Sequence, residues 1–477
     1  MRRPDTLFYA VILTLFSALV YWVVQAGERL ETAHVSASPS TGSQPWADFV
    51  VTLQHGLQAP LALLLAQVLA ILLAARALGW ACTKVGQPAV VGEMAAGILL
   101  GPSLLGRYLP EFSAVLFAPK SLDNIKLLSQ VGLILFMFVV GMDLDLQALR
   151  GKAHQAVVIS HASIVVPFAL GLGLAYFLYG AFAPAGVGFA SFGLFMGIAM
   201  SITAFPVLAR IVQERGLHQT PLGTLVITCA ATDDVTAWCL LAAVVAFVKA
   251  GSFASALAII ALALGYVLLM LKVARPLLLR LGQPAGQAGA LRKAAVPVFL
   301  LTLIFSAFLA EAIGIHALFG AFLAGAIMPA DGHLREAVSG KVRDVAVLLL
   351  LPLFFVFTGL RTQIGLLNDG TQWLVCAAII GVAVAGKFLG SALAARFVGH
   401  SWPNSFSIGA LMNTRGLMEL VVLNIGYDLG ILSPQVFAMM VIMALATTCM
   451  TGPALNLIAR WQASKSEEAA PQLVQSS

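Results

Sequence analysis

The chain has 477 residues, of which 60% are hydrophobic and 10% are charged, whereas soluble domains carry about 45–50% apolar and about 25% charged residues. This composition excludes a water-soluble fold. The formal net charge of +6 arises from Lys and Arg residues that stand singly or in twos between apolar stretches, so nucleic acid is not expected as a partner. The five cysteines are scattered without a CxxC pair or a matching His spacing, so no resident metal site is expected. No cofactor is expected either.

The apolar residues form runs of about twenty, the length at which a helix crosses about 30 Å of hydrocarbon. They predict an all-α integral membrane bundle. The fourteen candidate helices lie, in chain order, at 7–26, 59–80, 88–105, 127–143, 155–179, 185–211, 221–248, 253–272, 293–313, 315–330, 344–361, 371–397, 404–426 and 434–459.

Four domains follow from these runs. Residues 1–27 form an N-terminal transmembrane helix or a signal peptide, because Met1-Arg2-Arg3 precedes an apolar stretch that ends in a small residue. Residues 28–57, rich in Ser, Thr, Pro and Gly, are expected to be an extracytoplasmic linker. Residues 58–460 form the membrane domain of thirteen helices, and 461–477 a short cytoplasmic tail.

The distribution of Lys and Arg predicts the orientation. With a cytoplasmic start, nineteen of the 27 Lys and Arg residues fall on the cytoplasmic side, as the positive-inside rule requires. The expected location is therefore a cell (inner) membrane, with the C-terminus in the cytoplasm. Six cations fall on the outer side: Arg29, Arg107, Lys120, Lys126, Lys249 and Arg361.

Charges inside the spans mark the chemistry, because a charge in lipid is costly and by default lines a pathway or a site. Adjacent carboxylates Asp233 and Asp234 lie near the centre of one span. Their side chains diverge by about 100° around a helix, so one is expected to face a cavity while the other meets a partner. Lys387, the only lysine deep in a span, is the predicted partner of Asp233. The alternative is a purely structural ion pair, which would need only one acid.

Two spans contain a break. In SITAFPVLAR, Pro206 removes a helical donor at mid-span and Thr203 supplies a hydroxyl. In GALMNTRGLMEL, Asn413 and Thr414 stand in the interior of a later span. Pro206 alone could be a simple kink, but two interrupted helices in corresponding halves point to an inverted-repeat transporter whose site lies at their crossing.

The other charged residues allow more than one interpretation. Arg415 and Glu419 are four residues apart and share a helix face, so they are expected to form a structural or gating pair rather than an ion site. Glu93 could line the inner mouth or pack near the headgroups. Glu311 is expected at an ordinary interfacial turn, and His161 is expected to be a hydrogen-bonded core residue.

Several motifs extend the picture to a known family. They are QPAVVGEMAAGILLGPSLLG from Gln87, SITAFPVLARIVQE from Ser201, TDDVTAW from Thr232, IGIHALFGAFLAGAIMP from Ile313 and MNTRGLMELVVLNIG from Met412. Their sequences and order resemble the monovalent cation:proton antiporter-2 family, in particular its plant CHX-type members and related bacterial exchangers.

The resemblance implies an inverted-repeat bundle with a dimerisation half, a core half and two broken helices that cross. It implies a homodimer in the lipid bilayer, with Asp234 as the ion-binding aspartate, Asp233 as the variable position before it and Lys387 as the core lysine. Thr203 and Pro206 match the unwound stretch. CHX-type members often have Asn where this chain has Asp233, so the resemblance leaves the stoichiometry open.

The function that follows is secondary active antiport of a monovalent cation, Na⁺ or K⁺, against protons by alternating access. Asp234 would bind either the cation or a proton. Two protons would move per cation if Lys387 also released its proton, and one if it did not. A cation channel or a non-transporting membrane sensor on the same fold is the alternative, although no selectivity filter is apparent. An enzyme is not expected, because no nucleophile triad or phosphate loop appears.

Overall fold

The computed structural model describes residues 12, 14–26, 46, 49, 52, 56 and 59–474, apart from 144–152, 218–219, 251–252, 282–287 and 330–339. The chain divides into two compact units, Met1–Ala62 and Leu63–Ser477. In the first unit, Thr14–Ala26 is a short apolar helix, as expected of the segment predicted at 7–26. Most of the linker predicted at 28–57 lies outside the described residues.

One group of helices in the second unit packs through glycines. A Cβ on Gly97 would meet the backbone of Gly359, and a Cβ on Gly141 would meet the backbone of the helix that carries Gly325. Because no side chain separates them at these glycines, the two helices of each pair approach closely. We call this group the scaffold. Its helices, which contact one another in pairs, are α4 (Ala89–Leu100), α7 (Pro119–Asp143), α14 (Ala288–Ile313), α15 (Ala317–Ala326) and α17 (Leu351–Arg361), the last preceded by the π-helical turn η3 (Ala346–Leu350).

Shorter and flanking elements accompany the scaffold. They are α3 (Pro60–Lys84), α5 (Leu105–Tyr108), α6 (Pro110–Leu116) and the 3₁₀ turn η4 (Ile364–Leu366). A further segment consists of α12 (Phe253–Leu269), the π-helical turn η2 (Met270–Ala274) and α13 (Arg275–Leu281). Because α12 packs on both α11 and α14, it joins the scaffold to the remaining helices.

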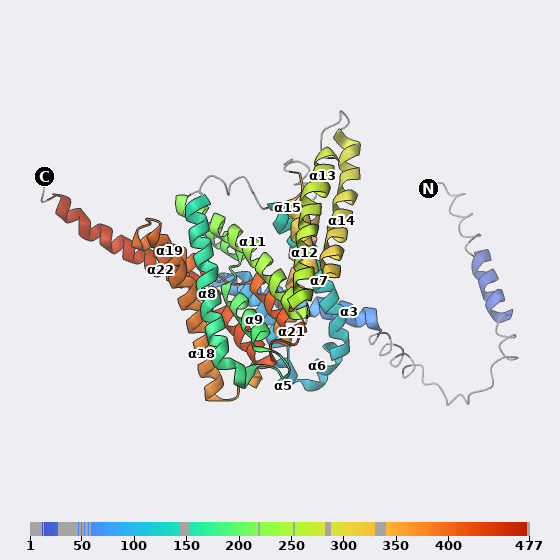
Figure 1. Cartoon of the computed structure of the whole chain (residues 1–477). Helices are drawn as coiled ribbons and strands as arrows, with labels where there is room; N and C mark the ends of the chain where they lie inside the picture. Colours follow the sequence, from blue (N-terminus) through green and yellow to red (C-terminus); the bar gives the residue numbers. More distant parts are fainter. Residues whose placement is uncertain are drawn as a thin grey trace. The chain divides into compact units, whose positions relative to one another are not determined.

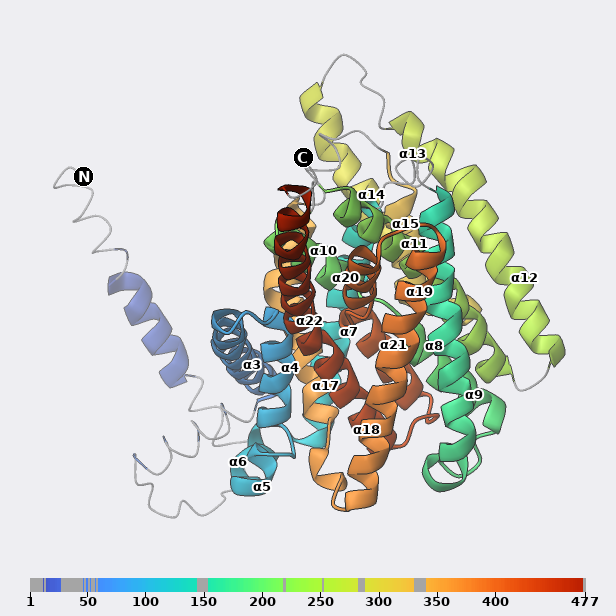
Figure 2. The ribbon, with the colours of Figure 1, turned by 90° about the vertical axis from the view of Figure 1, so that its left-hand side faces the viewer.

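The second group, which we call the core, is built around two interrupted helices. One is α9 (Phe189–Ser201) with α10 (Phe205–Glu214), and the other is α20 (Trp402–Met412) with α21 (Leu417–Asp428). They are enclosed by α8 (Ala153–Phe182), α11 (Pro221–Ala250), α18 (Gly370–Val384), the π-helical turn η5 (Ala385–Leu389), α19 (Gly390–Phe397) and α22 (Pro434–Val474). Figure 1 shows α8, α18 and α19 on one flank of this unit and α12, α13 and α14 on the other. In Figure 2, α8, α9 and α18 run alongside one another.

The helices meet the requirements for crossing a membrane. Among the described residues, ten helices are long and apolar enough, or up to eleven if α20 and α21, bent by 43°, count as one span. Large apolar side chains such as Phe177, Leu374 and Phe397 are exposed on the outside of the bundle, as expected where lipid rather than water surrounds the helices. The prediction of an all-α integral membrane bundle is confirmed. The count of thirteen stays a prediction, because α9 and α15 are too short to qualify alone.

The C-terminal segment differs from expectation in one respect. The last span was predicted to end near 459, but α22 continues as a helix to Val474. The segment expected as a short polar tail is therefore helical over residues 461–474.

Candidate ion-binding site

The first interrupted helix breaks over residues 202–204, between α9 and α10. Ile202 is extended, with φ −76° and ψ 137°, and Pro206 is one of the first two residues of α10. At that position the missing N–H of proline removes no helical hydrogen bond, because the first amides of a helix have no intrahelical partner. Pro206 thus begins the second half of the helix instead of kinking a continuous one.

The second break, residues 413–416, crosses the first. The main-chain N–H of Ala204 donates to the carbonyl oxygen of Thr414 at 3.1 Å, so the two breaks are joined directly. The hydroxyl of Thr448 on α22 donates to the carbonyl oxygen of Arg415 at 2.7 Å. A Cβ on Gly416 would lie 3.3 Å from the Cβ of Ala204. The predicted crossing of two broken helices is confirmed.

The C-terminal end of α9 is capped by side chains from other parts of the chain. The last four carbonyls of a helix have no intrahelical partner and carry the negative end of its dipole. Here all four, from residues 198–201, accept a side-chain hydrogen bond, two of them from one arginine and one from a lysine. The bonds are Ser201 Oγ to Ile198 O at 2.9 Å, Arg415 to Ala199 O at 2.9 Å and to Met200 O at 2.5 Å, and Lys387 Nζ to Ser201 O.

Asp233 is fully buried and surrounded by donors. Its Oδ1 accepts from Ser160 at 2.5 Å, and its Oδ2 accepts from Ser163 at 2.9 Å and Thr203 at 2.6 Å. Lys387 Nζ lies 3.3 Å from the same Oδ2, and both side chains have no exposed surface. The predicted ion pair between Asp233 and Lys387 is therefore confirmed. Four donors hold this carboxylate in place.

Asp234 differs sharply from its neighbour. Its side chain is 2% exposed, and within the part of the chain that the structure describes neither carboxylate oxygen has a hydrogen-bond partner. The main-chain N–H of Phe205, at the start of α10, lies beside it without completing a hydrogen bond. A buried carboxylate without donors is a costly arrangement. The side-chain oxygen of Asn413 and one oxygen of Glu419 also lack a partner, but Asp234 is the acid at this crossing in which neither oxygen has one among the described residues. It therefore has the most unused capacity for a cation or a proton.

Lys387 belongs to the π-helical turn η5 rather than to a regular helix. A π-helical turn is wider than an α-helical one and is frequent at functional sites. The ammonium group, which has three N–H donors, meets three acceptors: the carbonyl oxygens of Ser163, at 2.9 Å, and Ser201, and the carboxylate of Asp233. No N–H of Lys387 is left for a further ligand.

Arg415 and Glu419 form the predicted pair, with Nη1 of the arginine 3.2 Å from Oε1 of the glutamate and both side chains fully buried. Arg415 stands in the break, whereas Glu419 is in the first turn of α21, where a negative charge stabilises the N-terminal end of a helix. Because the same arginine also caps α9, it ties the two interrupted helices together.

The other predicted residues lie elsewhere. Glu93 is half-buried on α4 of the scaffold, outside the two interrupted helices. Glu311 accepts a hydrogen bond at 2.8 Å from the main-chain N–H of Ala317, so it caps the start of α15. His161 was predicted to be a core residue, and this is wrong. Its ring bonds to the Val157 carbonyl at 2.8 Å, as expected of a hydrogen-bonded histidine, but the side chain is exposed.

His316 lies between α14 and α15 and is the only residue other than glycine with a positive φ, 80°, among the described residues. Its Nδ1 accepts from the main-chain N–H of Leu318 at 3.4 Å, which caps α15. Burial lowers the pKa of the imidazole, and the carboxylate of Glu311 acts in the opposite direction. A histidine with a lowered pKa is neutral at pH 7, which suits its role as an acceptor.

Comparison with known proteins decides the family. The model of a family described as "Sodium/hydrogen exchanger, transmembrane" matches residues 68–461. The chain belongs to the sodium/hydrogen exchanger family. It is thus a multi-pass membrane antiporter that exchanges a monovalent cation for protons. The resemblance seen in the motifs is confirmed.

Individual relatives agree with this placement. The exchanger is 43% identical over 398 residues to the Na⁺/H⁺ antiporter NhaS4 of Synechocystis, which covers 82% of this chain and 96% of NhaS4. It is 39% identical to cation/H⁺ antiporter 17 of Arabidopsis thaliana and 31% identical to K⁺/H⁺ antiporter 1 of Saccharomyces cerevisiae, in each case over 84% of this chain. The exchanger spans only 49% and 46% of those two relatives.

A solved structure supports the fold. The sodium proton antiporter MjNhaP1 of Methanocaldococcus jannaschii superposes with a TM-score of 0.57 over 84% of this chain and 97% of that chain, at 15% sequence identity. At this identity the likeness concerns the fold alone.

The sequence interpretation missed the hydroxyl groups that hold the exchanger's site. Ser160 and Ser163 on α8 both bind Asp233, and Thr448 on α22 binds the second break. A signal was present, because hydroxyls three residues apart in an apolar span lie on one helix face. What the spacing could not show was which face of α8 turns toward Asp233.

Proposed function

We propose that Asp234 is the carrier group of this exchanger, binding a monovalent cation or a proton in alternation. The observation that carries the proposal is the contrast between the two adjacent acids: Asp233 has four donors, whereas Asp234 is buried with none among the described residues. A group that must exchange ligands has to be free of permanent partners. Asp234 meets this condition, and Asp233 does not.

Competition at one carboxylate is sufficient for coupling. An ionised carboxylate is costly to move through the hydrocarbon, whereas one neutralised by a cation or a proton is not. The core is therefore expected to switch between its outward-facing and inward-facing states only when Asp234 has bound a cation or a proton. Each passage with a cation must then be followed by a return with a proton, which is exchange by alternating access.

The contacts of Lys387 favour one proton per cation. Its three N–H donors already meet two carbonyl oxygens and the carboxylate of Asp233. Removing a proton would leave two N–H donors for three acceptors, so one of these acceptors would face a lone pair. Lys387 is therefore proposed to stay charged throughout the cycle, with Asp233 as its fixed counter-charge and Thr203 as a positioning residue for Asp233.

Further features of the proposal follow from the relatives and the charge pattern. The transported cation is Na⁺ or K⁺, as the relatives' names include both. The positive-inside distribution supports a cytoplasmic C-terminus in a cell (inner) membrane, and the resemblance to antiporters supports a homodimer. Asn413, Thr414 and Pro206 are proposed to shape the crossing rather than to bind the cation.

The test uses inverted membrane vesicles with an acidic interior. Addition of Na⁺, K⁺ or Li⁺ should drive proton efflux from vesicles that contain the parent protein, and Asp234→Asn should reduce that efflux to the level of vesicles without the protein. Undiminished efflux with Asp234→Asn would refute the proposal. Efflux should also be indifferent to an imposed membrane potential. Exchange of two protons per cation would instead move one net charge, so the membrane potential would contribute about 2.3 kcal/mol per 100 mV to its driving force. The potential would then accelerate exchange in one direction.

A further inference from the structure

A small pocket with charged residues in its lining lies where α17 and α21 end, away from the crossing. It is lined by Lys126, Ser129 and Gln130 on α7, Arg361 on α17, His316, and one stripe of α21. The stripe consists of Val421, Asn424, Ile425 and Asp428, whose spacing places them on a single helix face. Because α21 begins at the second break, this pocket follows α21 from its far end back toward the candidate ion site.

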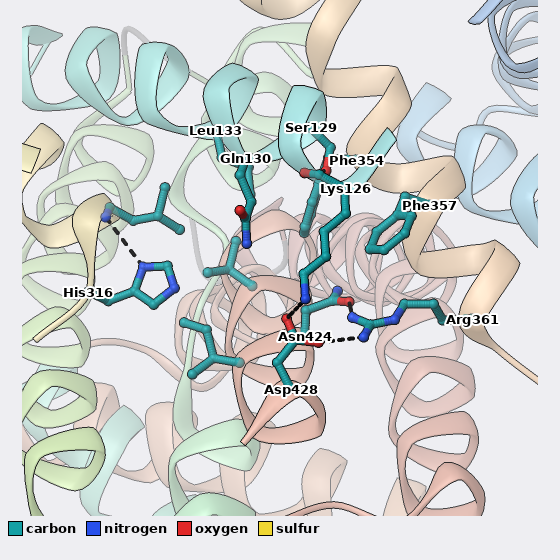
Figure 3. Close-up of a pocket in the computed structure, with 13 residues that line it drawn as sticks. Lys126, Ser129, Gln130, Leu133, His316, Phe354, Phe357, Arg361, Asn424 and Asp428 are labelled. Atoms are coloured by element: carbon teal, nitrogen blue, oxygen red, sulfur yellow. Dashed lines mark hydrogen bonds and ion pairs between the residues drawn. The ribbon is translucent and has the colours of Figure 1, made fainter. Parts of the chain in front are cut away.

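Ion pairs join three of the residues that line the pocket. Lys126 Nζ lies 3.1 Å from one oxygen of Asp428, and Arg361 pairs with the other. Arg361 also donates to the Asn424 side-chain oxygen at 2.9 Å. Figure 3 shows Lys126 and Arg361 reaching Asp428 from different helices. The side chains are 32%, 17% and 27% exposed for Lys126, Arg361 and Asp428, so the pairs lie at the surface end of the pocket.

These bonds connect the two helix groups. Lys126 and Arg361 belong to the scaffold helices α7 and α17, whereas Asp428 and Asn424 belong to α21 of the core. Asn424 adds a further bond across the same boundary, from its Nδ2 to Thr358 Oγ1 at 2.8 Å. Any movement of the core against the scaffold at this end must break them. The side chain of Val421, deeper in the pocket, is 2% exposed while they are formed.

The two cations also stand out in the sequence. Lys126 and Arg361 are among the six Lys and Arg residues expected on the outer side. At least two of that small set therefore converge on one carboxylate. The guanidinium of Arg361 is further held over the rings of Phe357, at 5.0 Å, and Tyr427, at 4.6 Å, where cation–π attraction fixes its position.

We propose that Lys126, Arg361 and Asp428 form an ion-pair latch between scaffold and core that closes the outer access route to the ion site. The latch rests on the proposed function, since it presupposes that the core moves relative to the scaffold. When the latch opens, Asp428 is released from its two built-in cations and becomes the acid that an arriving Na⁺ or K⁺ meets first. The pocket along α21 then becomes the outer vestibule.

The latch is tested by the accessibility of the pocket behind it. Val421→Cys places a thiol inside the pocket, and Val422→Cys places one on the adjacent residue, which does not line it. Both are introduced into the full chain, and a charged, membrane-impermeant methanethiosulfonate reagent is added to right-side-out vesicles. The parent chain, with its five free cysteines, gives the background labelling.

Breaking the latch should expose Val421→Cys. With Asp428→Asn or Lys126→Met, its labelling should be faster because the latch is broken. The increase should be only about three- to tenfold, because partly exposed ion pairs are individually weak. With Asp428→Glu or Lys126→Arg, which keep the charges, Val421→Cys should be labelled as slowly as it is with the latch residues unchanged. The labelling of Val422→Cys should stay slow in every variant. Choline chloride at high concentration should accelerate labelling only where the latch is intact, since salt screens exposed charges.

The outcomes separate the latch from the proposed function. If Asp428→Asn and Lys126→Met both leave the labelling of Val421→Cys unchanged, the latch is refuted. If labelling accelerates while Asp234→Asn still exchanges ions, the latch stands and the carrier assignment falls. Should Asp428→Asn fail to accumulate in the membrane, Lys126→Met alone decides, since it removes only the more exposed member of the network.

Discussion

Replacement of Arg415 tests whether this residue acts chiefly as a helix cap or as an ion-pair partner. Arg415→Met removes two hydrogen bonds to the carbonyl oxygens of Ala199 and Met200 and the contact with Glu419 at 3.2 Å. Each carbonyl left without a donor costs about 1–3 kcal/mol, and breaking a buried pair costs about 3–5 kcal/mol. Together these losses come to about 5–11 kcal/mol, comparable to a typical folding stability of about 5–15 kcal/mol.

Two further variants separate the contributions. Glu419→Gln removes only the ion pair, and the arginine still neutralises the negative end of α9, so we expect a loss of about 1–3 kcal/mol. Arg415→Lys keeps the charge but cannot donate to all three acceptors with the geometry of a guanidinium, so its stability should fall between the other two. Arg460→Met, which changes an exposed arginine on α22, is the matched control and should change stability by less than about 0.5 kcal/mol.

The assay is thermal unfolding of the detergent-solubilised protein, followed by the fraction that remains monodisperse in size-exclusion chromatography after heating. The midpoint should decrease in the order parent, Glu419→Gln, Arg415→Lys, Arg415→Met. If Glu419→Gln lowers the midpoint as much as Arg415→Met, the ion pair rather than the capping of α9 holds the crossing, and the reasoning is wrong.

Two more predictions concern the crossing. Gly416→Ala places a Cβ 2.9 Å from Val207 Cγ2, so vesicles with this variant should exchange ions at least tenfold more slowly than the parent. Gly381→Ala, whose Cβ meets nothing within 4 Å, should exchange ions like the parent. Equal rates for the two variants would contradict the close approach at Gly416. Thr203→Val removes one of the donors to Asp233 and should lower stability by about 1.5–3 kcal/mol in the thermal assay. Thr203→Ser, which keeps the hydroxyl, should lower it far less, and identical midpoints for the two variants would show that the hydroxyl does not matter.

The charged residues of the core were predictable because lipid penalises them so strongly. A buried lysine needs a partner, and an acid in another span was the natural choice, so the pair of Asp233 and Lys387 followed from their positions inside predicted spans. The two breaks were likewise readable from Pro206 and from the cluster at residues 413–416, since each interrupts an otherwise apolar helix. Local chemistry was sufficient in both cases.

Rotation and termination of helices were not predictable in the same way. His161 and Ser160 are adjacent in α8, yet one is exposed and the other binds Asp233, and nothing in a uniformly apolar span fixes which face turns inward. Lys387 lies in a π-helical turn whose sequence, AGKFL, is equally compatible with a regular α-helix, so the turn could not be predicted. Asp428 was overlooked because a charge at the end of a span is ordinarily taken as solvated, whereas here it joins two helix groups.

The charges at the crossing leave one acid unmatched among the described residues. Asp233 is paired with Lys387, and Arg415 with Glu419, so each pair is formally neutral. The cations of both pairs cap the negative end of α9, and Glu419 lies at the positive end of α21. Asp234 is outside this balance. The two ion pairs are held in place by their hydrogen bonds to the fold, so a mechanism can leave their protonation unchanged. Such a mechanism needs only the charge of Asp234 to be neutralised. One carboxylate neutralised in turn by a cation and a proton gives exchange of one for one, and this is why the second aspartate need not add a second proton.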